Sequence, residues 1–211
     1  MHTAFEPTAT WYSDARQYWK DVPSTVEGML GGLGRLTDLD VRDSTWFLDD
    51  TTYGLDCGAG IGRVTKQLLL NFFDRVDLVE CTGKFLEQAR DDVLKQEVET
   101  GRVDRLFHTG LEAFSPEAQR YDLVWCQWVL NYLTDDDLVL FLKRCVAGLK
   151  PNGIIGVKEN CAVSEYVMDH EDSSVTRSDA VFKSLFERAG LHVIKEAVQS
   201  SFPSDLFTVR M

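Results

Sequence analysis

Several features are scarce in this 211-residue sequence, and each scarcity argues against a class of protein. No apolar run approaches the ~20 residues that a membrane-spanning helix needs, and residues 1–30 lack the apolar core of a signal peptide. Five residues are proline, so the composition differs from that of disordered or collagen-like chains. The five cysteines form no CxxC pair and the four histidines show no metal-ligand spacing, which argues against a zinc site.

Positive charge is also scarce, with 22 Lys and Arg against 34 Asp and Glu and a net charge of −12. Such a surface repels phosphate backbones, so we expect a cationic partner and no nucleic acid. An odd number of scattered cysteines is typical of reduced thiols, which indicates a cytoplasmic or nuclear location. The apolar content of 44% is typical of a globular chain, and the length fits one domain.

Strand and helix patterns alternate from residue 52 onward. Short apolar runs predict strands at 53–57, 76–79, 106–107, 122–126 and 154–157. Helical spacing predicts helices at 63–73, 82–98, 138–149 and 180–189, and residues 191–197 and 206–209 can form a closing hairpin. Repeated strand–helix units indicate an α/β fold with a largely parallel sheet and helices on both faces.

The N-terminal segment has a different pattern. Residues 11–20 have the apolar spacing of an amphipathic helix. Residues 28–34 contain too many glycines for a stable helix and predict a loop whose backbone packs closely on another element. We therefore expect one domain over 1–211, with a helix and glycine-rich lid at 1–45 and a core at 46–211.

The glycine run between the first predicted strand and its helix is the strongest motif. Gly58, Gly60 and Gly62 form a GxGxG run, and Glu80 ends the next strand, where a ribose-binding acid is expected. A dinucleotide fingerprint would need glycine where this chain has Arg63, which disfavours an NAD dehydrogenase. No GKS or GKT follows, so the run is not a P-loop.

This run resembles the first motif of the class I S-adenosylmethionine-dependent methyltransferases, and Glu80 resembles their ribose acid. Residues 149–153 resemble the turn before their fifth strand. The resemblance implies a Rossmann-like, seven-stranded, mostly parallel sheet and S-adenosylmethionine as the cofactor. It also implies that Arg63 lies near the methionine carboxylate, because a helix N-terminus and a guanidinium both favour an anion.

Further strings look like the protein α-N-terminal methyltransferases, and the likeness covers nearly the whole chain. The strings are residues 18–20, 28–32, 55–63, 127–129, 151–155 and 172–175. Members of that family methylate the free α-amine of proteins that begin Xaa-Pro-Lys once Met is removed. The resemblance therefore implies basic protein or peptide N-termini as partners, those of ribosomal proteins among the candidates, and no membrane.

The resemblance also assigns residues by position. It assigns cofactor contacts to Trp19, Gly58, Arg63, Glu80, Cys81, Thr82, Leu111, Glu112 and Gln127. It assigns substrate contacts to Leu30, Trp128, Asn160, Asp169, Asp172 and Ser174, and it implies no metal. Three positions depart from the family pattern: Tyr132 replaces a usual histidine, Glu159 a usual aspartate, and Phe207 a tyrosine.

The chemistry of an α-amine agrees with these residue types. Its pKa of about 7.7–8.0 leaves it mostly protonated at neutral pH, and only the neutral amine can attack a methyl group. The site must therefore accept a proton and align the amine. We expect Asp172 to be the base, with Glu159 as the other available carboxylate, Tyr132 as a positioning group and Asn160 as an anchor for the N-terminus.

The same residues leave other functions open. Trp128 suits a proline ring, and Asp169 with Asp172 suits a lysine ammonium, but an acidic run is more often a solvated loop. One alternative is a methyltransferase that acts on a small amine or cationic metabolite. Another is a cofactor-binding interaction module without turnover, whose acidic loop docks a basic partner.

Overall fold

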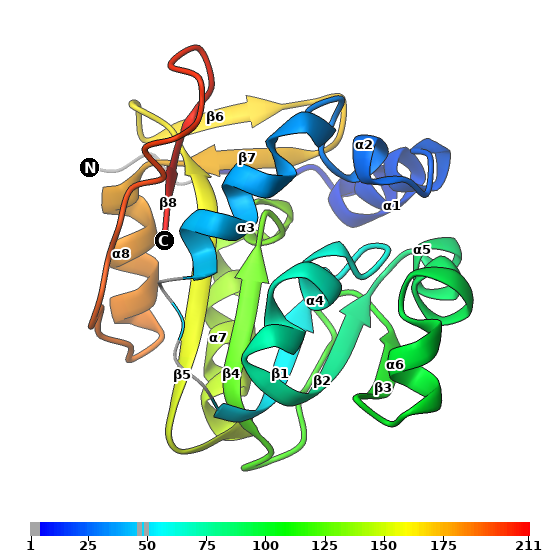
Figure 1. Cartoon of the computed structure of the whole chain (residues 1–211). Coiled ribbons are helices and arrows are strands. Elements are labelled where there is room, and N and C mark those ends of the chain that lie inside the picture. Colours follow the sequence, from blue (N-terminus) through cyan, green and yellow to red (C-terminus); the bar gives the residue numbers. More distant parts are fainter. Residues whose placement is uncertain (1–4, 46–47, 49–50) are drawn as a thin grey trace.

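A six-stranded sheet forms the centre of the computed structural model, which describes residues 5–45, 48 and 51–211 (Figure 1). The strand order is β3-β2-β1-β4-β5-β8. β1 to β5 are parallel and β8 is antiparallel to β5. The strands are β1 Thr51–Cys57, β2 Phe73–Glu80, β3 Val103–His108, β4 Tyr121–Gln127, β5 Leu149–Cys161 and β8 Thr208–Arg210. The predicted α/β class is confirmed, with six strands in the described sheet instead of seven.

Helices cover both faces of this sheet, as the strand–helix alternation predicts. α7 (Asp135–Gly148) and α8 (Asp179–Arg188) pack on one face, and Figure 1 shows α7 behind the strands. α4 (Arg63–Gln67), α5 (Gly83–Gln88) and α6 (Lys95–Glu99) contribute to the core on the other face. Each face therefore buries its own apolar cluster against the strands between them.

Two predicted helices are shorter than their apolar spacing suggests. Residues 63–73 form α4 and then a 3₁₀ turn at Leu69–Asn71, because Leu68, Leu69 and Leu70 are all buried and consecutive residues cannot share one face of an α-helix. Residues 82–98 are divided by a π turn at Ala89–Val93. Ala89 and Leu94 are both fully buried five residues apart, and a π turn is the local geometry that matches that spacing.

The predicted hairpin of residues 191–197 with 206–209 is wrong. Residues 192–196 are exposed and form no strand, so no alternate side chains are buried to favour a ladder. Instead, a short antiparallel bridge forms further along the chain, at Val198 and Arg210: Ala197 and Met211 donate to each other, the Gln199 amide donates to the Val209 carbonyl, and β8 is added to β5. A separate hairpin of β6 (Tyr166–Asp169) and β7 (Ser174–Arg177) forms where the sequence shows only an acidic run.

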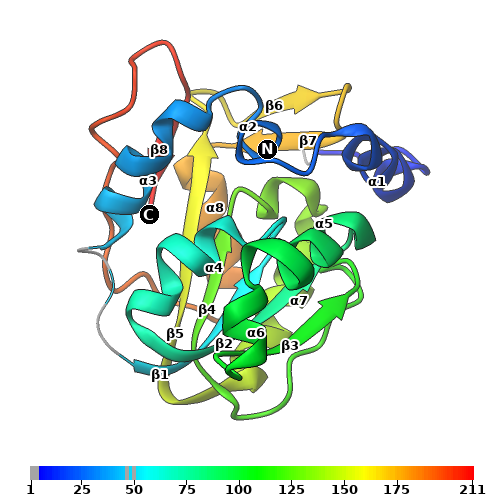
Figure 2. The same ribbon diagram turned by 45° about the vertical axis from the view of Figure 1, so that its right-hand side comes forward.

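The N-terminal elements lie over the carboxyl ends of the strands, at the same end as the β6–β7 hairpin (Figure 2). α1 (Trp11–Asp21) confirms the predicted helix, and its buried Trp11 donates from Nε1 to the Tyr132 carbonyl at 2.7 Å. The glycine-rich segment is not a simple loop, because it starts inside α2 (Val26–Met29) and precedes α3 (Thr37–Thr45). The expected boundary after residue 45 adjoins residues 46–47, which lie outside the described residues.

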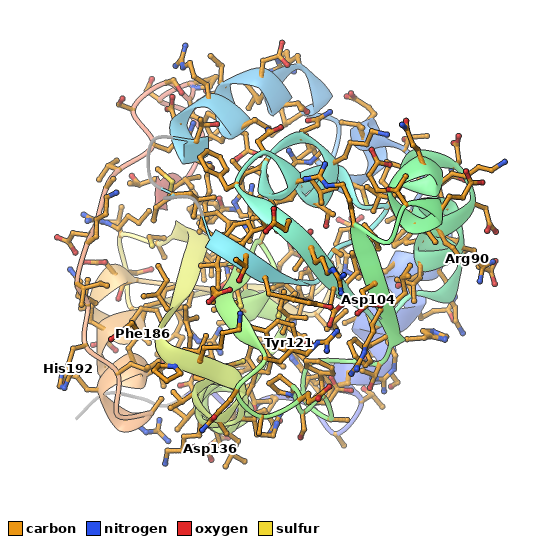
Figure 3. The ribbon with its side chains drawn as sticks, turned by 60° about the horizontal axis from the view of Figure 1, so that its bottom comes forward. Arg90, Asp104, Tyr121, Asp136, Phe186 and His192 are labelled. Carbon is orange, nitrogen blue, oxygen red and sulfur yellow. The ribbon has the colours of Figure 1, made fainter. Side chains whose placement is uncertain are left out.

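The opposite end of the molecule carries a network of polar side chains that includes Asp104 and Tyr121, both labelled in Figure 3. Fully buried Asp77 accepts hydrogen bonds from Arg120 Nε at 2.9 Å, Tyr121 Oη at 2.8 Å and Tyr53 Oη at 3.1 Å. Asp104 accepts from Arg120 at 2.7 Å and lies 2.7 Å from Tyr53 Oη, whose single proton it shares with Asp77. These charges stabilise the fold and leave the carboxyl end of the sheet as the place for a ligand. None of the helices in the described part of the chain is long and apolar enough to cross a membrane.

Candidate active site

A cavity opens at the carboxyl ends of β1, β2 and β4, beside α1. The chain leaves β1 toward β2 on one side and reaches β4 on the other, which is the switch point where α/β sheets bind ligands. Eight of the nine predicted cofactor residues line this cavity: Trp19, Gly58, Arg63, Glu80, Cys81, Leu111, Glu112 and Gln127. The ninth, Thr82, is buried beside it.

The turn after β1 brings its backbone to the cavity. Gly58 has a φ of +70°, and a Cβ at this position would lie 2.4 Å from Val129 Cγ2. The Gly58 and Ala59 amides both donate to the Val79 carbonyl, at 2.9 and 3.0 Å. No larger residue fits this conformation and this contact together, so the glycine is required by the close approach of the turn to the loop after β4.

Glu80 holds this turn from the end of β2. Its carboxylate accepts from the Gly60 amide at 2.9 Å and from the Thr82 amide at 2.7 Å. Burial raises the pKa of Glu80, while these backbone hydrogen bonds oppose the rise. Thr82 therefore takes part in this hydrogen bonding through its backbone amide. Each carboxylate oxygen of Glu80 can still accept a further hydrogen bond from a ligand hydroxyl.

Aromatic side chains form the wall under α1. The Trp19 ring lies 5.8 Å from Tyr132 and 6.1 Å from Phe85, both edge-on. Trp128 also lines the cavity, with a φ of +53° that is unusual for a residue with a side chain. Its buried indole Nε1 has no hydrogen-bond partner among the described residues. Strained backbone and an orphaned donor at a cavity are typical of a functional position.

A hydrogen bond between Tyr132 and Asp172 connects the cavity wall with the acidic segment, residues 168–172. The Tyr132 hydroxyl donates to Asp172 Oδ2 at 2.7 Å, and Asp172 Oδ1 is buried without a hydrogen-bond partner among the described residues. Burial, and then the Asp172 charge, raise the pKa of Tyr132 well above its usual value. Burial, followed by Asp172, Glu171 and Asp169, also raises the pKa of Tyr18. The acidic segment therefore faces α1.

Glu159 lies in the protein interior instead of at the cavity. Its Oε1 accepts from the Val129 and Leu130 amides, each at 2.7 Å, and its Oε2 accepts from Asn131 Nδ2 at 3.2 Å. Burial raises the pKa of Glu159 to about 8, although the backbone hydrogen bonds oppose this. Glu159 therefore supports the turn that carries Trp128 and Tyr132, and the structure does not place it among the residues that line the cavity.

The remaining substrate candidates surround the cavity without lining it. Asn160 is at the end of β5, and Asp169 and Ser174 face each other across the β6–β7 hairpin. Met29, rather than Leu30, lines the cavity from α2. The structure thus brings eight cofactor candidates and one substrate candidate, Trp128, into one cavity, and the other substrate candidates do not line it.

Two residues at this site have no distinguishing pattern in the sequence. Asp40 of α3 accepts from Arg63 Nη1 at 2.7 Å, and the Lys158 Nζ of β5 lies 2.6 Å from its other oxygen. Burial lowers the pKa of Lys158, although Asp40 opposes the shift. These residues are 118 positions apart, so only the folded chain shows that they meet.

A mostly parallel sheet with this order and a cavity under a GxGxG turn defines the class I S-adenosylmethionine-dependent methyltransferase fold. Within that class, a family model described as "AdoMet dependent proline di-methyltransferase" matches residues 7–211, and the chain belongs to this family. It is 46% identical to the N-terminal Xaa-Pro-Lys N-methyltransferase 1 of Danio rerio, over 97% of this chain and 95% of that protein. It is 41% identical to the alpha N-terminal protein methyltransferase 1 of Arabidopsis thaliana, over 95% of this chain and 78% of that one.

A solved structure of a SAM-dependent methyltransferase from Leishmania major superimposes on the chain with a TM-score of 0.89. The two are 42% identical, and the match covers 95% of this chain and 81% of that one. S-adenosylmethionine is therefore the cofactor. The residues present fit it, because the glycine turn leaves no room for a Cβ, and buried Glu80 and Arg63 both reach the cavity.

Proposed function

We propose that this methyltransferase acts on the free α-amino group of proteins that begin Xaa-Pro-Lys after Met removal. The relatives that carry this activity in their names match almost the whole chain at 41–46% identity. The observation that supports it most directly is the Tyr132–Asp172 pair, which presents a buried, unpartnered carboxylate oxygen beside the cavity. Such an oxygen suits the acceptance of a proton from an amine.

The proposed cofactor residues are the eight that line the cavity, with Thr82 acting through its amide. In this proposal Glu80 accepts from the ribose hydroxyls, Arg63 donates to the carboxylate of the methionine end, and Trp19 covers that end under α1. When bound, S-adenosylmethionine supplies an electrophilic methyl group on its sulfonium. The apolar wall of Trp19, Phe85 and Tyr132 excludes water from that region.

The proposed substrate residues hold and deprotonate the amine. Asp172 Oδ1 accepts the amine proton, and Tyr132 stays protonated and fixes the carboxylate through Oδ2. The Asn160 side chain anchors the N-terminal residue, and Trp128 packs on the proline ring. Asp169 and Asp172 pair with the ammonium of the third-position lysine, while Leu30 and Ser174 complete the edge of the site.

Location and organisation are further proposals. The five cysteines are free and four of them are buried, which suits a reducing compartment such as the cytoplasm or nucleus. Residues 1–45 act as a lid on a core of residues 46–211 within one domain. Basic N-termini, including those of ribosomal proteins, are the proposed partners, and the acidic net charge disfavours nucleic acid.

Intact-mass measurement of a Ser-Pro-Lys-Arg peptide after incubation with the enzyme and S-adenosylmethionine tests this function. We expect an increase by one or more methyl groups, and no change in the same peptide with an acetylated N-terminus. Methylation of both peptides would place the reaction on a side chain instead of the α-amine. Methylation of neither peptide, together with turnover of small amines, would favour a small-molecule methyltransferase. Cofactor binding with no acceptor would favour an interaction module.

A further inference from the structure

A buried group of charges joins α3, the start of α4, β4 and β5 next to the cavity. The Asp40 carboxylate accepts from Arg63 Nη1 at 2.7 Å and from Gln127 Nε2 at 2.8 and 2.9 Å. The Lys158 ammonium lies 2.6 Å from Asp40 Oδ1. The side chains of Asp40, Arg63 and Lys158 are 2%, 5% and 0% exposed, so none of these charges is screened by bulk water.

Lys158 anchors Asp40 and does not itself line the cavity. Its three N–H groups are matched by three acceptors on α3: the Asp40 carboxylate, the Asp40 carbonyl at 3.0 Å and Ser44 Oγ at 2.8 Å. An ammonium has three donors, so this one has none left for a ligand. Lys158 therefore fixes the position of Asp40 relative to β5.

The other two partners of Asp40 do line the cavity. Arg63 uses one of its five N–H donors on Asp40, and no other hydrogen bond of this guanidinium involves a described residue. Gln127 accepts from Trp125 Nε1 at 3.1 Å while its Nε2 donates to Asp40, so both ends of its amide are fixed. Asp40 thus connects an immobile ammonium to two side chains that face the cofactor.

We propose that Asp40 is a positioning residue for the cofactor, which holds Arg63 and Gln127 in the orientation that receives the carboxylate of the methionine end. This inference rests on the proposed contact between Arg63 and that carboxylate. Within this group one carboxylate lies between two buried cations, and most of the N–H donors of Arg63 remain available for a second carboxylate, that of the ligand. Asp40 therefore contributes to affinity through Arg63, without touching the ligand itself.

Two ligands separate this role from a merely structural one. S-adenosylhomocysteine carries the methionine-end carboxylate, and 5′-methylthioadenosine lacks it. By calorimetry, we expect Asp40→Asn to weaken S-adenosylhomocysteine binding by about tenfold or more, the size of a charged hydrogen bond. We expect 5′-methylthioadenosine to bind as it does to the wild type. Equal losses for both ligands, or no loss for either, would overturn the proposal.

Asp43→Asn is the matched control, because Asp43 is on the same helix and accepts from Gln199 and Ser201 instead of residues that line the cavity. Asp43→Asn should cause no selective loss of S-adenosylhomocysteine affinity relative to 5′-methylthioadenosine affinity. Asp40→Asn leaves the Lys158 ammonium uncompensated and can impair folding. The pair Asp40→Asn with Lys158→Met removes both charges and keeps the side-chain volumes, so it should fold and show the same selective loss.

Arg63→Ala completes the comparison. Like the Asp40 variants, Arg63→Ala should bind S-adenosylhomocysteine more weakly and 5′-methylthioadenosine as the wild type does. Adding Asp40→Asn to Arg63→Ala should cause little further loss of S-adenosylhomocysteine affinity. Discrimination by Arg63→Ala with none by either Asp40 variant would refute the role of Asp40 alone. Lack of discrimination by Arg63→Ala would remove the premise and the inference with it. These binding measurements need no peptide, so a failure of the proposed peptide methylation would be seen separately.

Discussion

Two carboxylates expected near the reacting amine, Asp172 and Glu159, have different environments in the folded chain. Asp172 keeps one oxygen unpartnered beside the cavity, whereas both oxygens of Glu159 accept hydrogen bonds from the turn after β4. The raised pKa of Tyr132 makes this phenol a poor base at neutral pH. These differences favour Asp172 as the proton acceptor.

We therefore predict that Asp172→Asn lowers kcat by roughly 10²–10⁴-fold at saturating peptide, the usual range for loss of a general base. Tyr132→Phe should cost much less, because it removes only the hydrogen bond that orients Asp172. Both variants should bind S-adenosylhomocysteine normally. The check is a pH–rate profile of wild type and both variants on one peptide. A near-normal kcat for Asp172→Asn would place the loss of the amine proton in solvent before binding.

Glu159 should govern stability more than catalysis. Its pKa is about 8 in the folded chain, against about 4.5 for an ordinary glutamate. Between these values the folded state holds a proton that the unfolded state has lost, so stability falls as pH rises. This contribution is fully present below about pH 4.5 and is lost as pH approaches 8, by about 1.4 kcal/mol for each unit of pKa difference before any relaxation of the site.

Glu159→Gln should make the free energy of unfolding less dependent on pH between 5 and 8. Its Oε1 still accepts from the Val129 and Leu130 amides, and its Nε2 can donate to Asn131 Oδ1 once the Asn131 amide, which now points its Nδ2 at this position, turns over. Part of the slope should remain, because burial raises the pKa of Asp56 to about 7. Urea unfolding at several pH values measures this effect. Identical slopes in wild type and variant would contradict the assignment.

At the scale of elements, the turn between β1 and α4 sets the cavity. Gly58→Ala should weaken cofactor binding, because the added Cβ would collide with Val129 and displace either the turn or the loop that carries Trp128. Gly101→Ala is the control: Gly101 has a similar φ of +73°, but its Cβ would meet open space. Both should lose about 1 kcal/mol of stability from the left-handed conformation, and a thermal shift with S-adenosylhomocysteine should be reduced only in Gly58→Ala. Equal ligand shifts in the two variants would contradict the role of the turn.

The order of strands and helices could be predicted from the sequence because each element has a local apolar pattern. The parallel sheet, both helix layers and α1 follow from those patterns. The failures have local physical causes: the π turn at Ala89–Val93 depends on tertiary burial, and the exposed segment 192–196 has no face to bury. The spacing of apolar residues does not show whether a strand face will be buried by another element, so the pairing of the C-terminal segments could not be predicted.

The sequence predicted the candidate site only where residues of suitable chemistry belong to one recognisable local motif. The glycine run with Arg63 and Glu80 meets that condition, and these residues do line one cavity. Asp40 and Lys158 do not, because a buried ion pair between distant segments has no signature in a single sequence. The place of Glu159 in the interior was also hidden, since its three donors come from residues about thirty positions earlier.

At the scale of the whole molecule, the net charge of −12 should attract a basic N-terminus from a distance. This field and the local pairing of Asp169 and Asp172 with a third-position lysine depend differently on salt. The Debye length falls from ~10 Å at 0.1 M salt to ~3 Å at 1 M, so long-range attraction is lost first. Contacts within the site are screened much less.

We predict that kcat/KM for a Ser-Pro-Lys-Arg peptide falls several-fold between 50 mM and 0.5 M NaCl, measured at saturating cofactor. A Ser-Pro-Gln-Arg peptide should have a lower kcat/KM at every salt concentration, because it leaves the acidic pair without its ammonium. Asp169→Asn should lower kcat/KM for the lysine peptide. Asp74→Asn makes the same change in net charge at the exposed start of β2, at the amino end of the sheet, and should have a much smaller effect. If the two variants, or the two peptides, behave alike, the acidic hairpin is only a solvated part of a negative surface, and lysine recognition lies elsewhere.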